Sequence, residues 1–191
     1  MMKQAPEILR ILQDKFAGKI IKSEMAVVDP FIVVLPDAIV EVYSFLKSHD
    51  DLAFDTLMCL SGVDYKGLKS EPDRIEVVYH LFSMKLRHKI VVKVQLPREN
   101  PSVPTVESIW AIANWHEREA YDMLGIRFEG HSDLRRILCP DDWVGYPLRK
   151  DYVQPETYRG MPVAPTKQFV EMAMEGQEVG TDPFVADSRK G

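Results

Sequence analysis

Hydrophobic positions in the first quarter of the chain recur at two different spacings. Residues 8–16 and 36–47 carry apolar side chains three or four positions apart, which predicts two short amphipathic helices. Residues 19–28 and 31–35 lie between them, are divided by an Asp-Pro turn dipeptide, and are predicted as strands. The chain is therefore expected to begin with the order helix, strand, strand, helix.

A β-hairpin is the clearest prediction in the next part of the chain. Residues 74–84 and 88–96 are rich in β-branched side chains, and the short link between them favours an antiparallel pair. His80 and His88 near its ends are expected to be structural rather than ligands. Residues 54–63 fit a helix or a strand equally well. Together these elements predict an α+β fold, with a mixed or antiparallel sheet packed with helices.

The densest apolar pattern predicts a helix over residues 106–124, with Thr105 as its N-cap and Gly125 as its end. The helix is apolar on nearly all sides, which is typical of a helix buried between layers. Glu117 and Glu119 lie two positions apart, so they point in nearly opposite directions, each among apolar neighbours. A buried ionised carboxylate is costly unless it is paired, so both are expected to have cationic or hydrogen-bonding partners.

Arginines near this helix are the expected partners of its acids. Four of them follow it in sequence: Arg127, Arg135, Arg136 and Arg149. On the helix itself, Arg118 and Asp122 are four positions apart and are expected to pair.

The same stretch contains residues that bind metals or exchange protons in other proteins: His116, Glu117, Glu119, Asp122 and His131. The zinc-protease pattern H-E-x-x-H needs two histidines four positions apart on one helix, but Ala120 stands four residues after His116. His131 lies beyond two glycines, in a different element. These observations favour a structural ion-pair network over a metal or catalytic site.

Composition excludes several classes of protein. The 191 residues are about one domain with an appendage, 46% of them are hydrophobic, and the net charge of −5 argues against a nucleic-acid partner. Cys59 and Cys139 form no CxxC pair and are expected to be quiet buried thiols. An iron–sulfur cluster needs about four thiolates, and neither a Gly-rich phosphate loop nor a G-x-S-x-G motif occurs. The sequence therefore shows no means of binding NAD, flavin or iron–sulfur clusters by itself.

The amino-acid composition of the chain changes after residue 138. Six of the thirteen prolines lie in residues 139–191, interspersed with large aromatic and basic residues. Prolines hold the chain extended, and aromatics are favoured at interfaces, so these residues predict an arm that lies on a partner. One short helix is expected over residues 166–174, and a disordered tail is the stronger alternative only for residues 176–191. The predicted organisation is a globular domain, 1–138, and an arm, 139–191.

No window of about 18 apolar residues free of charge occurs, so no transmembrane helix is expected. The first twelve residues lack a continuous apolar core and a cleavage site, which argues against a secretory signal. We therefore expect a chain that stays in the cytoplasm and is held at any membrane by partners.

Five motifs together resemble one family. They are ERE at 117–119, YDM at 121–123, GIRFEGH at 125–131, DLRRIL at 133–138 and PLRKDY at 147–152. Their types and spacing resemble the 30 kDa subunit of proton-pumping NADH:quinone oxidoreductase, respiratory complex I. FDTLMCLSGVDY at 54–65 is a weaker match, and Ser132 stands where the family usually has proline.

The resemblance implies a cofactor-free scaffold subunit in the hydrophilic arm of a complex that passes electrons from NADH through FMN and iron–sulfur clusters to quinone, coupled to proton translocation. It implies that the chain packs on the quinone-reducing 49 kDa subunit, peripheral to the cytoplasmic side of the inner membrane, with the C-terminal arm wrapped on that neighbour. The nearer alternative is the equivalent subunit of an energy-converting hydrogenase or related dehydrogenase. The farther one is a freestanding metal-dependent enzyme.

Two sets of residues follow from this interpretation, and neither is expected to be catalytic. The structural signature consists of Glu117, Arg118, Glu119, Tyr121, Asp122, Gly125, His131, Asp133, Arg135 and Arg136. The residues expected to contact the partner are Trp143, Pro147, Leu148, Arg149, Lys150, Asp151, Tyr152 and Tyr158.

Overall fold

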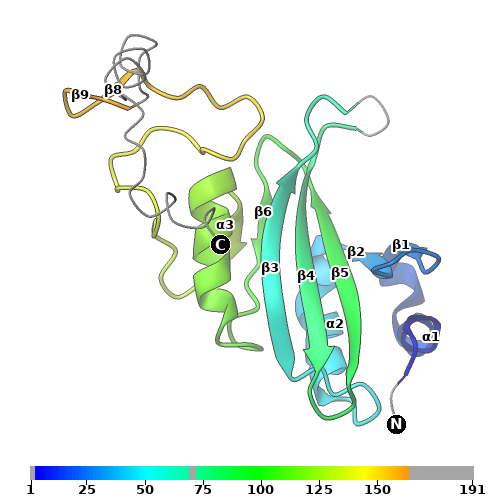
Figure 1. Cartoon of the computed structure of the whole chain (residues 1–191). Helices are drawn as coiled ribbons and strands as arrows, with labels where there is room; N and C mark the ends of the chain where they lie inside the picture. The colour runs from blue at the N-terminus through cyan, green and yellow to red at the C-terminus, as the bar shows by residue number, and fades with distance from the viewer. Residues whose placement is uncertain (1–2, 69–71, 164–191) are drawn as a thin grey trace, which may run out of the picture. The chain divides into compact units, whose positions relative to one another are not determined.

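The computed structural model describes residues 3–68 and 72–163 (Figure 1). Its contacts divide the chain into two compact units, Met1–Tyr152 and Val153–Gly191. The first unit thus includes residues 139–152, which the sequence pattern assigned to the arm. The expected helix at 166–174 and the tail at 176–191 lie outside the described residues.

A five-stranded mixed sheet forms the centre of the first unit and confirms the predicted α+β fold. Its strands are β1 (Ile20–Glu24), β2 (Phe31–Val34), β3 (Thr56–Asp64), β4 (Ile75–Ser83) and β5 (His88–Leu96), in the order β1-β2-β5-β4-β3. The predicted hairpin is β4 with β5, antiparallel throughout. The only parallel pairing in this sheet joins β2 to β5. The segment with the ambiguous pattern is strand β3.

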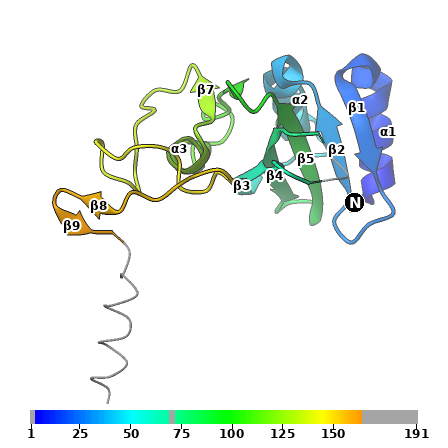
Figure 2. The ribbon, with the colours of Figure 1, turned by 90° about the horizontal axis from the view of Figure 1, so that it is seen from above.

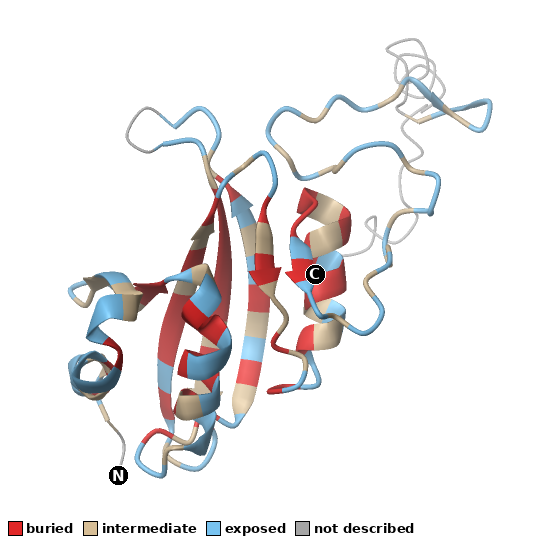
Figure 3. Cartoon of the chain, turned by 180° about the vertical axis from the view of Figure 1, so that it is seen from behind, coloured by how far each residue is buried: buried red, intermediate tan, exposed pale blue. Residues whose placement is uncertain are grey.

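Helices cover one face of this sheet. After α1 (Ala5–Phe16) and a 3-10 turn, η1 (Ala17–Lys19), comes β1; after η2 (Pro36–Ala38) comes α2 (Ile39–Ser48). Figure 3 shows α2 lying across the sheet, with α1 beside it. Within the described ranges no helix is long and apolar enough to cross a bilayer.

The core lies between α2 and the alternate residues of β4 that point toward it. Tyr79 of β4 packs edge-on against Tyr43 of α2, with 5.0 Å between ring centroids. Trp110 also packs against Tyr43, with 5.5 Å between ring centroids, and donates its indole N–H to the Phe54 carbonyl at 3.1 Å. The segment before the next helix is therefore fixed in the core by its tryptophan.

The predicted helix 106–124 is wrong in its first half. Helix α3 begins only at Ala113 and runs Ala113–Leu124, while residues 105–112 form turns. Trp110 occupies the core, and the Thr105 side chain binds a residue of α3 instead of capping the helix. The predicted end is confirmed, because Gly125 is the C-cap in the left-handed conformation, at φ 73°.

Helix α3 packs beside the edge strand β3 (Figures 1 and 2). Next to it, β6 (Ser102–Pro104) pairs in parallel with β7 (Arg127–Glu129), so the chain before and after α3 is joined. In the second unit, β8 (Thr157–Tyr158) and β9 (Met161–Pro162) form a small antiparallel hairpin.

Gly62 of β3 makes the close approach of α3 possible. A Cβ atom there would lie 2.3 Å from Leu124 Cδ1 and 2.8 Å from Ile126 Cδ1, and both of those side chains are buried. We expect Gly62→Ala to lower the free energy of unfolding by about 1–3 kcal/mol through overpacking, measured by urea denaturation.

Gly18→Ala is the matched control, because nothing lies within 4 Å of a Cβ at Gly18. It should leave the urea midpoint unchanged or slightly raised. Equal midpoints for both variants would show that Leu124 and Ile126 move aside without cost.

Candidate functional site

Two acids of α3 are fully buried, and they are not the predicted pair. Glu117 and Asp122 have 0% exposure, whereas Glu119 is exposed. The expectation that Glu119 is buried is therefore wrong. Helix α3 meets β3 through the stripe of Ala120 and Leu124, and Glu119 lies at the margin of that contact, lining a cavity of about 190 Å³.

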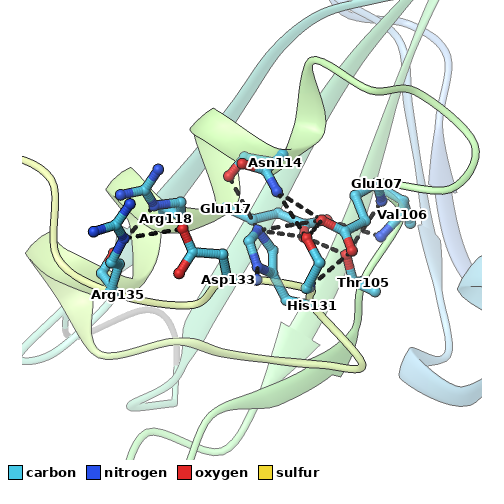
Figure 4. Close-up of polar contacts among 10 residues, drawn as sticks. Thr105, Val106, Glu107, Asn114, Glu117, Arg118, His131, Asp133 and Arg135 are labelled. Atoms are coloured by element: carbon cyan, nitrogen blue, oxygen red, sulfur yellow. Dashed lines mark hydrogen bonds and ion pairs between the residues drawn. The ribbon is translucent and has the colours of Figure 1, made fainter.

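Glu117 binds the loop that precedes α3 (Figure 4). Its Oε1 accepts the N–H of Val106 at 2.8 Å, and its Oε2 accepts the hydroxyl of Thr105. The nearest ring nitrogen, His131 Nε2, lies 3.9 Å from Oε2. The predicted arginine partners of Glu117 are thus replaced by a backbone donor and a hydroxyl. Burial raises the pKa of Glu117 to about 7, although these two hydrogen bonds oppose the rise.

Glu107 joins the same loop to the turn after β7. It accepts the Ser132 N–H at 2.8 Å and the side-chain amide of Asn114 at 2.7 Å, and the Ser132 hydroxyl lies at 3.0 Å. Although burial raises the pKa of Glu107, these hydrogen bonds lower it by more. Ser132 is the position where the resembled family usually has proline, and proline has no N–H to donate. The serine therefore adds a contact at this turn.

Asp122 holds the chain that follows this turn. Its Oδ1 pairs with Arg136 Nη1 at 2.6 Å, and its Oδ2 accepts three successive backbone N–H groups at 2.7–3.0 Å: Ile137, Leu138 and Cys139. Burial alone would raise the pKa of Asp122, but these donors hold it below its ordinary value. Of the expected arginine partners, Arg136 fills the role for Asp122.

Arg118 does not fill the role predicted for it on the helix. Its Nε donates to the backbone carbonyl of Arg135 at 3.3 Å, and its guanidinium lies 5.1 Å from the Trp115 ring centroid. The predicted pair is therefore not formed: Asp122 binds residues 136–139, and Arg118 binds the backbone at residue 135.

Residues 146–149 fold over the C-terminal end of α3. Arg149 Nε donates to the Leu124 carbonyl at 2.7 Å, and the Leu148 N–H donates to the Met123 carbonyl at 3.0 Å. These bonds satisfy carbonyl groups that a helix end leaves unpaired. Tyr146 packs so closely on Gly125 that a Cβ there would lie 2.5 Å from its ring.

A second group of charges ties residues 150–151 to the end of the sheet. Asp64 accepts both Nε and Nη2 of Arg98, at 3.0 and 2.9 Å, and also the Lys150 N–H at 2.9 Å. Asp151 pairs with Arg98 and with Lys66. Although burial raises the pKa of Asp64, these donors lower it by more. The carboxylate is therefore ionised and anchors this segment within its own unit.

Several residues expected to contact a partner thus have neighbours within the chain. The Trp143 indole donates to the Tyr152 hydroxyl at 3.0 Å, and Pro147 is half-buried. Leu148 has 61% of its surface exposed, and Tyr158 lies in the second unit. Their contact with another protein stays a prediction.

The remaining signature residues lie at the surface or at its margin. Asp133 and Arg135 pair with each other at 2.9 Å and are exposed. Tyr121 is half-buried and lines an open hollow with Arg127 and Arg149. Both signs of charge and two tyrosine side chains are present there.

The alternative metal site gains no support. Over residues 3–68 and 72–163, no three His, Cys, Asp or Glu side chains converge in a way that could hold a metal ion. Glu119 is exposed and does not join the buried pair of Glu117 and His131. Cys59 and Cys139 are unpaired and half-buried, which is less than the burial expected of them.

Four residues of these clusters were missed by sequence reasoning: Glu107, Asn114, Asp64 and Arg98. Glu107 and Asn114 are 7 positions apart and Asp64 and Arg98 are 34 apart, and neither pair lies within one helix or strand, so periodic spacing gives no signal for them. The prediction that Thr105 is the N-cap of the helix is wrong: α3 begins at Ala113, and the Thr105 hydroxyl binds Glu117 and accepts the Glu107 N–H.

Asp122 and Glu119 test the distinction between buried and exposed acids. Asp122→Ala leaves Arg136 and three N–H groups without their acceptor, and we expect a loss of about 3–5 kcal/mol in unfolding free energy. Glu119→Ala, on the same helix, should change it by less than about 0.5 kcal/mol. Thermal and urea denaturation of both variants would measure this. Similar losses in the two would contradict the assigned burial.

Comparison with known proteins gives a consistent result. Residues 32–158 match the family described as "Respiratory-chain NADH dehydrogenase, 30 Kd subunit". The chain is 43% identical over 164 residues to the NADH-quinone oxidoreductase subunit designated C of Chlorobium phaeobacteroides, covering 85% of this chain and 96% of that one. It is 46% identical over 156 residues to the subunit of the same designation from Chloroherpeton thalassium, covering 81% of this chain and 63% of that longer protein.

Two solved structures share the fold. A trypsin-resistant fragment of Nqo5 superposes with a TM-score of 0.58 at 30% identity, covering 69% of this chain and all of the fragment. A chain of the membrane-bound sulfane sulfur reductase, an archaeal respiratory membrane complex, superposes with a TM-score of 0.64 over 93% of this chain and 95% of that one. At 24% identity, the second similarity concerns the fold alone.

Proposed function

The chain belongs to the family of 30 kDa subunits of respiratory-chain NADH dehydrogenase, and from this premise we propose that it is a cofactor-free scaffold in the hydrophilic arm of an NADH:quinone oxidoreductase. The observation that carries the proposal is the 43% identity to the Chlorobium subunit over 96% of that protein's length. The chemistry then belongs to the complex, which moves electrons from NADH through FMN and iron–sulfur clusters to quinone and couples this transfer to proton translocation.

The use of charge in the described residues supports a scaffolding role. Glu117, Asp122 and Asp64 bind backbone N–H groups of irregular segments. Their arrangement fixes the geometry of loops, which is the property that a protein-binding surface needs.

The proposed partner is the quinone-reducing 49 kDa subunit, and the proposed location is peripheral, on the cytoplasmic side of the inner membrane. Several large apolar side chains from the start of α3 to the end of the first unit are exposed and support a protein contact there: Ile112, Trp115, Leu138, Val144 and Leu148. In this proposal, residues 139–152 contact the partner with their outward faces, and the arm continues beyond them.

The first test is recovery of the tagged chain from gently solubilised membranes. We expect the 49 kDa subunit to co-purify, with flavin and iron–sulfur absorbance and NADH-dependent quinone reduction. A nickel-containing large subunit without an NADH-oxidising module would instead support the hydrogenase alternative. A colourless, solitary chain would contradict both.

A pair of variants tests the docking surface itself. Leu148→Asp places a charge on an exposed apolar position that we assign to the interface, and Met84→Asp does the same at 65% exposure in the turn between β4 and β5. We expect Leu148→Asp to reduce co-purified partner by about tenfold or more, which corresponds to about 1.4 kcal/mol. Met84→Asp should recover the wild-type amount. Equal recovery would remove Leu148 from the interface.

A further inference from the structure

Three titratable groups meet at the start of α3, and two of them are acids. His131 Nε2 lies 3.6 Å from Glu107 Oε2 and 3.9 Å from Glu117 Oε2, and the histidine side chain is fully buried. Glu117 is also fully buried. Two carboxylates therefore share one imidazole (Figure 4). Glu107 has 18% of its side chain exposed, whereas the Glu117 carboxyl group lies where an unbalanced charge is costly.

The hydrogen bonds of His131 identify its charge state. Its Nδ1 accepts the N–H of Asp133 at 2.9 Å, so that nitrogen carries no proton. Its Nε2 then bears the hydrogen and donates to the Asn114 carbonyl at 3.1 Å. The imidazole is neutral in this arrangement. Charging it would put a proton on Nδ1 and break the bond to Asp133.

Because His131 is neutral, it does not balance a negative charge on Glu117, and no other described group that faces Glu117 is a cation. From the 105–107 loop comes Glu107, which is itself held as an anion by Ser132 and Asn114. From β4 comes the phenol of Tyr79, whose pKa is raised well above its ordinary value by burial and by Glu117. The neighbouring Arg118 binds the Arg135 carbonyl and lies over Trp115.

Glu117 itself is suited to hold a proton here. The Thr105 hydroxyl beside its Oε2 accepts as readily as it donates, so it can receive an O–H from a protonated carboxyl group. The other oxygen keeps the Val106 N–H in either state. Burial supports the same conclusion, because it raises the pKa of this carboxyl to about 7.

We propose that Glu117 holds one exchangeable proton at the junction of the 105–107 loop, α3 and the 131–133 turn, and that loss of this proton loosens the junction. The junction is thus a pH-sensitive latch. It leads directly into residues 137–139, which bind Asp122, so it controls the base of the segment that folds over α3. This proposal does not rest on the function proposed above.

The sign of the effect follows from proton linkage. The carboxyl pKa is raised from 4.5 in the unfolded or opened state to about 7 in the closed one. The stability that the proton contributes is fully present below 4.5 and is lost as the pH rises through about 7. Opening of the junction should therefore become more frequent from about pH 5 to pH 7 and then level off.

The test is hydrogen exchange of the Val106 and Asp133 amides in the full-length chain between pH 5 and pH 8, corrected for intrinsic exchange rates. In the wild type we expect the opening constant to rise by about tenfold or more over this range. Glu117→Gln keeps the shape of the protonated carboxyl but cannot ionise, so its opening constant should be flat. Glu119→Gln, on the exposed side of the same helix, should follow the wild type.

Two outcomes would overturn the proposal: a wild-type opening constant that does not change with pH, or an unchanged slope in Glu117→Gln. If Glu117→Gln does not fold, the carboxyl carbon of Glu117 can be titrated by NMR in the wild-type chain. A midpoint near 7 supports the latch, and a midpoint at the ordinary value near 4.5 refutes it.

Discussion

The buried carboxylate of Asp122 is the interaction on which the second half of the domain depends. Beyond β7 the first unit has no further helix or strand among its described residues, so regular backbone pairing does not position the chain there. One carboxylate instead collects Arg136 and three successive N–H groups. Removing a carboxylate from water is costly, and only such a dense set of donors offsets that cost.

The same arrangement recurs at the other buried acids. Glu117 accepts the N–H of Val106, and Asp64 accepts those of Lys66 and Lys150. In each case an acidic side chain on or next to a regular element binds the backbone of an irregular one. Buried backbone groups must find partners, and here acids provide them where no neighbouring strand is available. These acidic side chains therefore hold the irregular segments in place, as backbone hydrogen bonds hold the strands of a sheet.

Sequence patterns predicted four of the five strands of the sheet, left β3 ambiguous, and were insufficient for these contacts. The hairpin of β4 and β5 follows from β-branched residues and a short link, which are local signals. The start of α3 does not follow from local signals. Residues 106–112 have the apolar spacing of a helix, but Trp110 is held in the core and the helix begins only at Ala113. Glu117 and Glu119 look alike in sequence, but Glu117 is buried against the 105–107 loop and His131, whereas Glu119 lies at the exposed margin of the contact between α3 and β3.

The two borders of the central sheet bear on how this chain behaves before assembly. A long, flat, unpaired strand is a template for aggregation. At one border β3 lies against α3, with Gly62 drawing the two together. At the other, β1 has only five residues, an irregular register between Ile20 and Lys22, and a lysine at its centre. Each border therefore carries a feature that hinders strand pairing between a newly made subunit and a second copy of the chain: a helix packed against β3, and a short, irregular and charged β1.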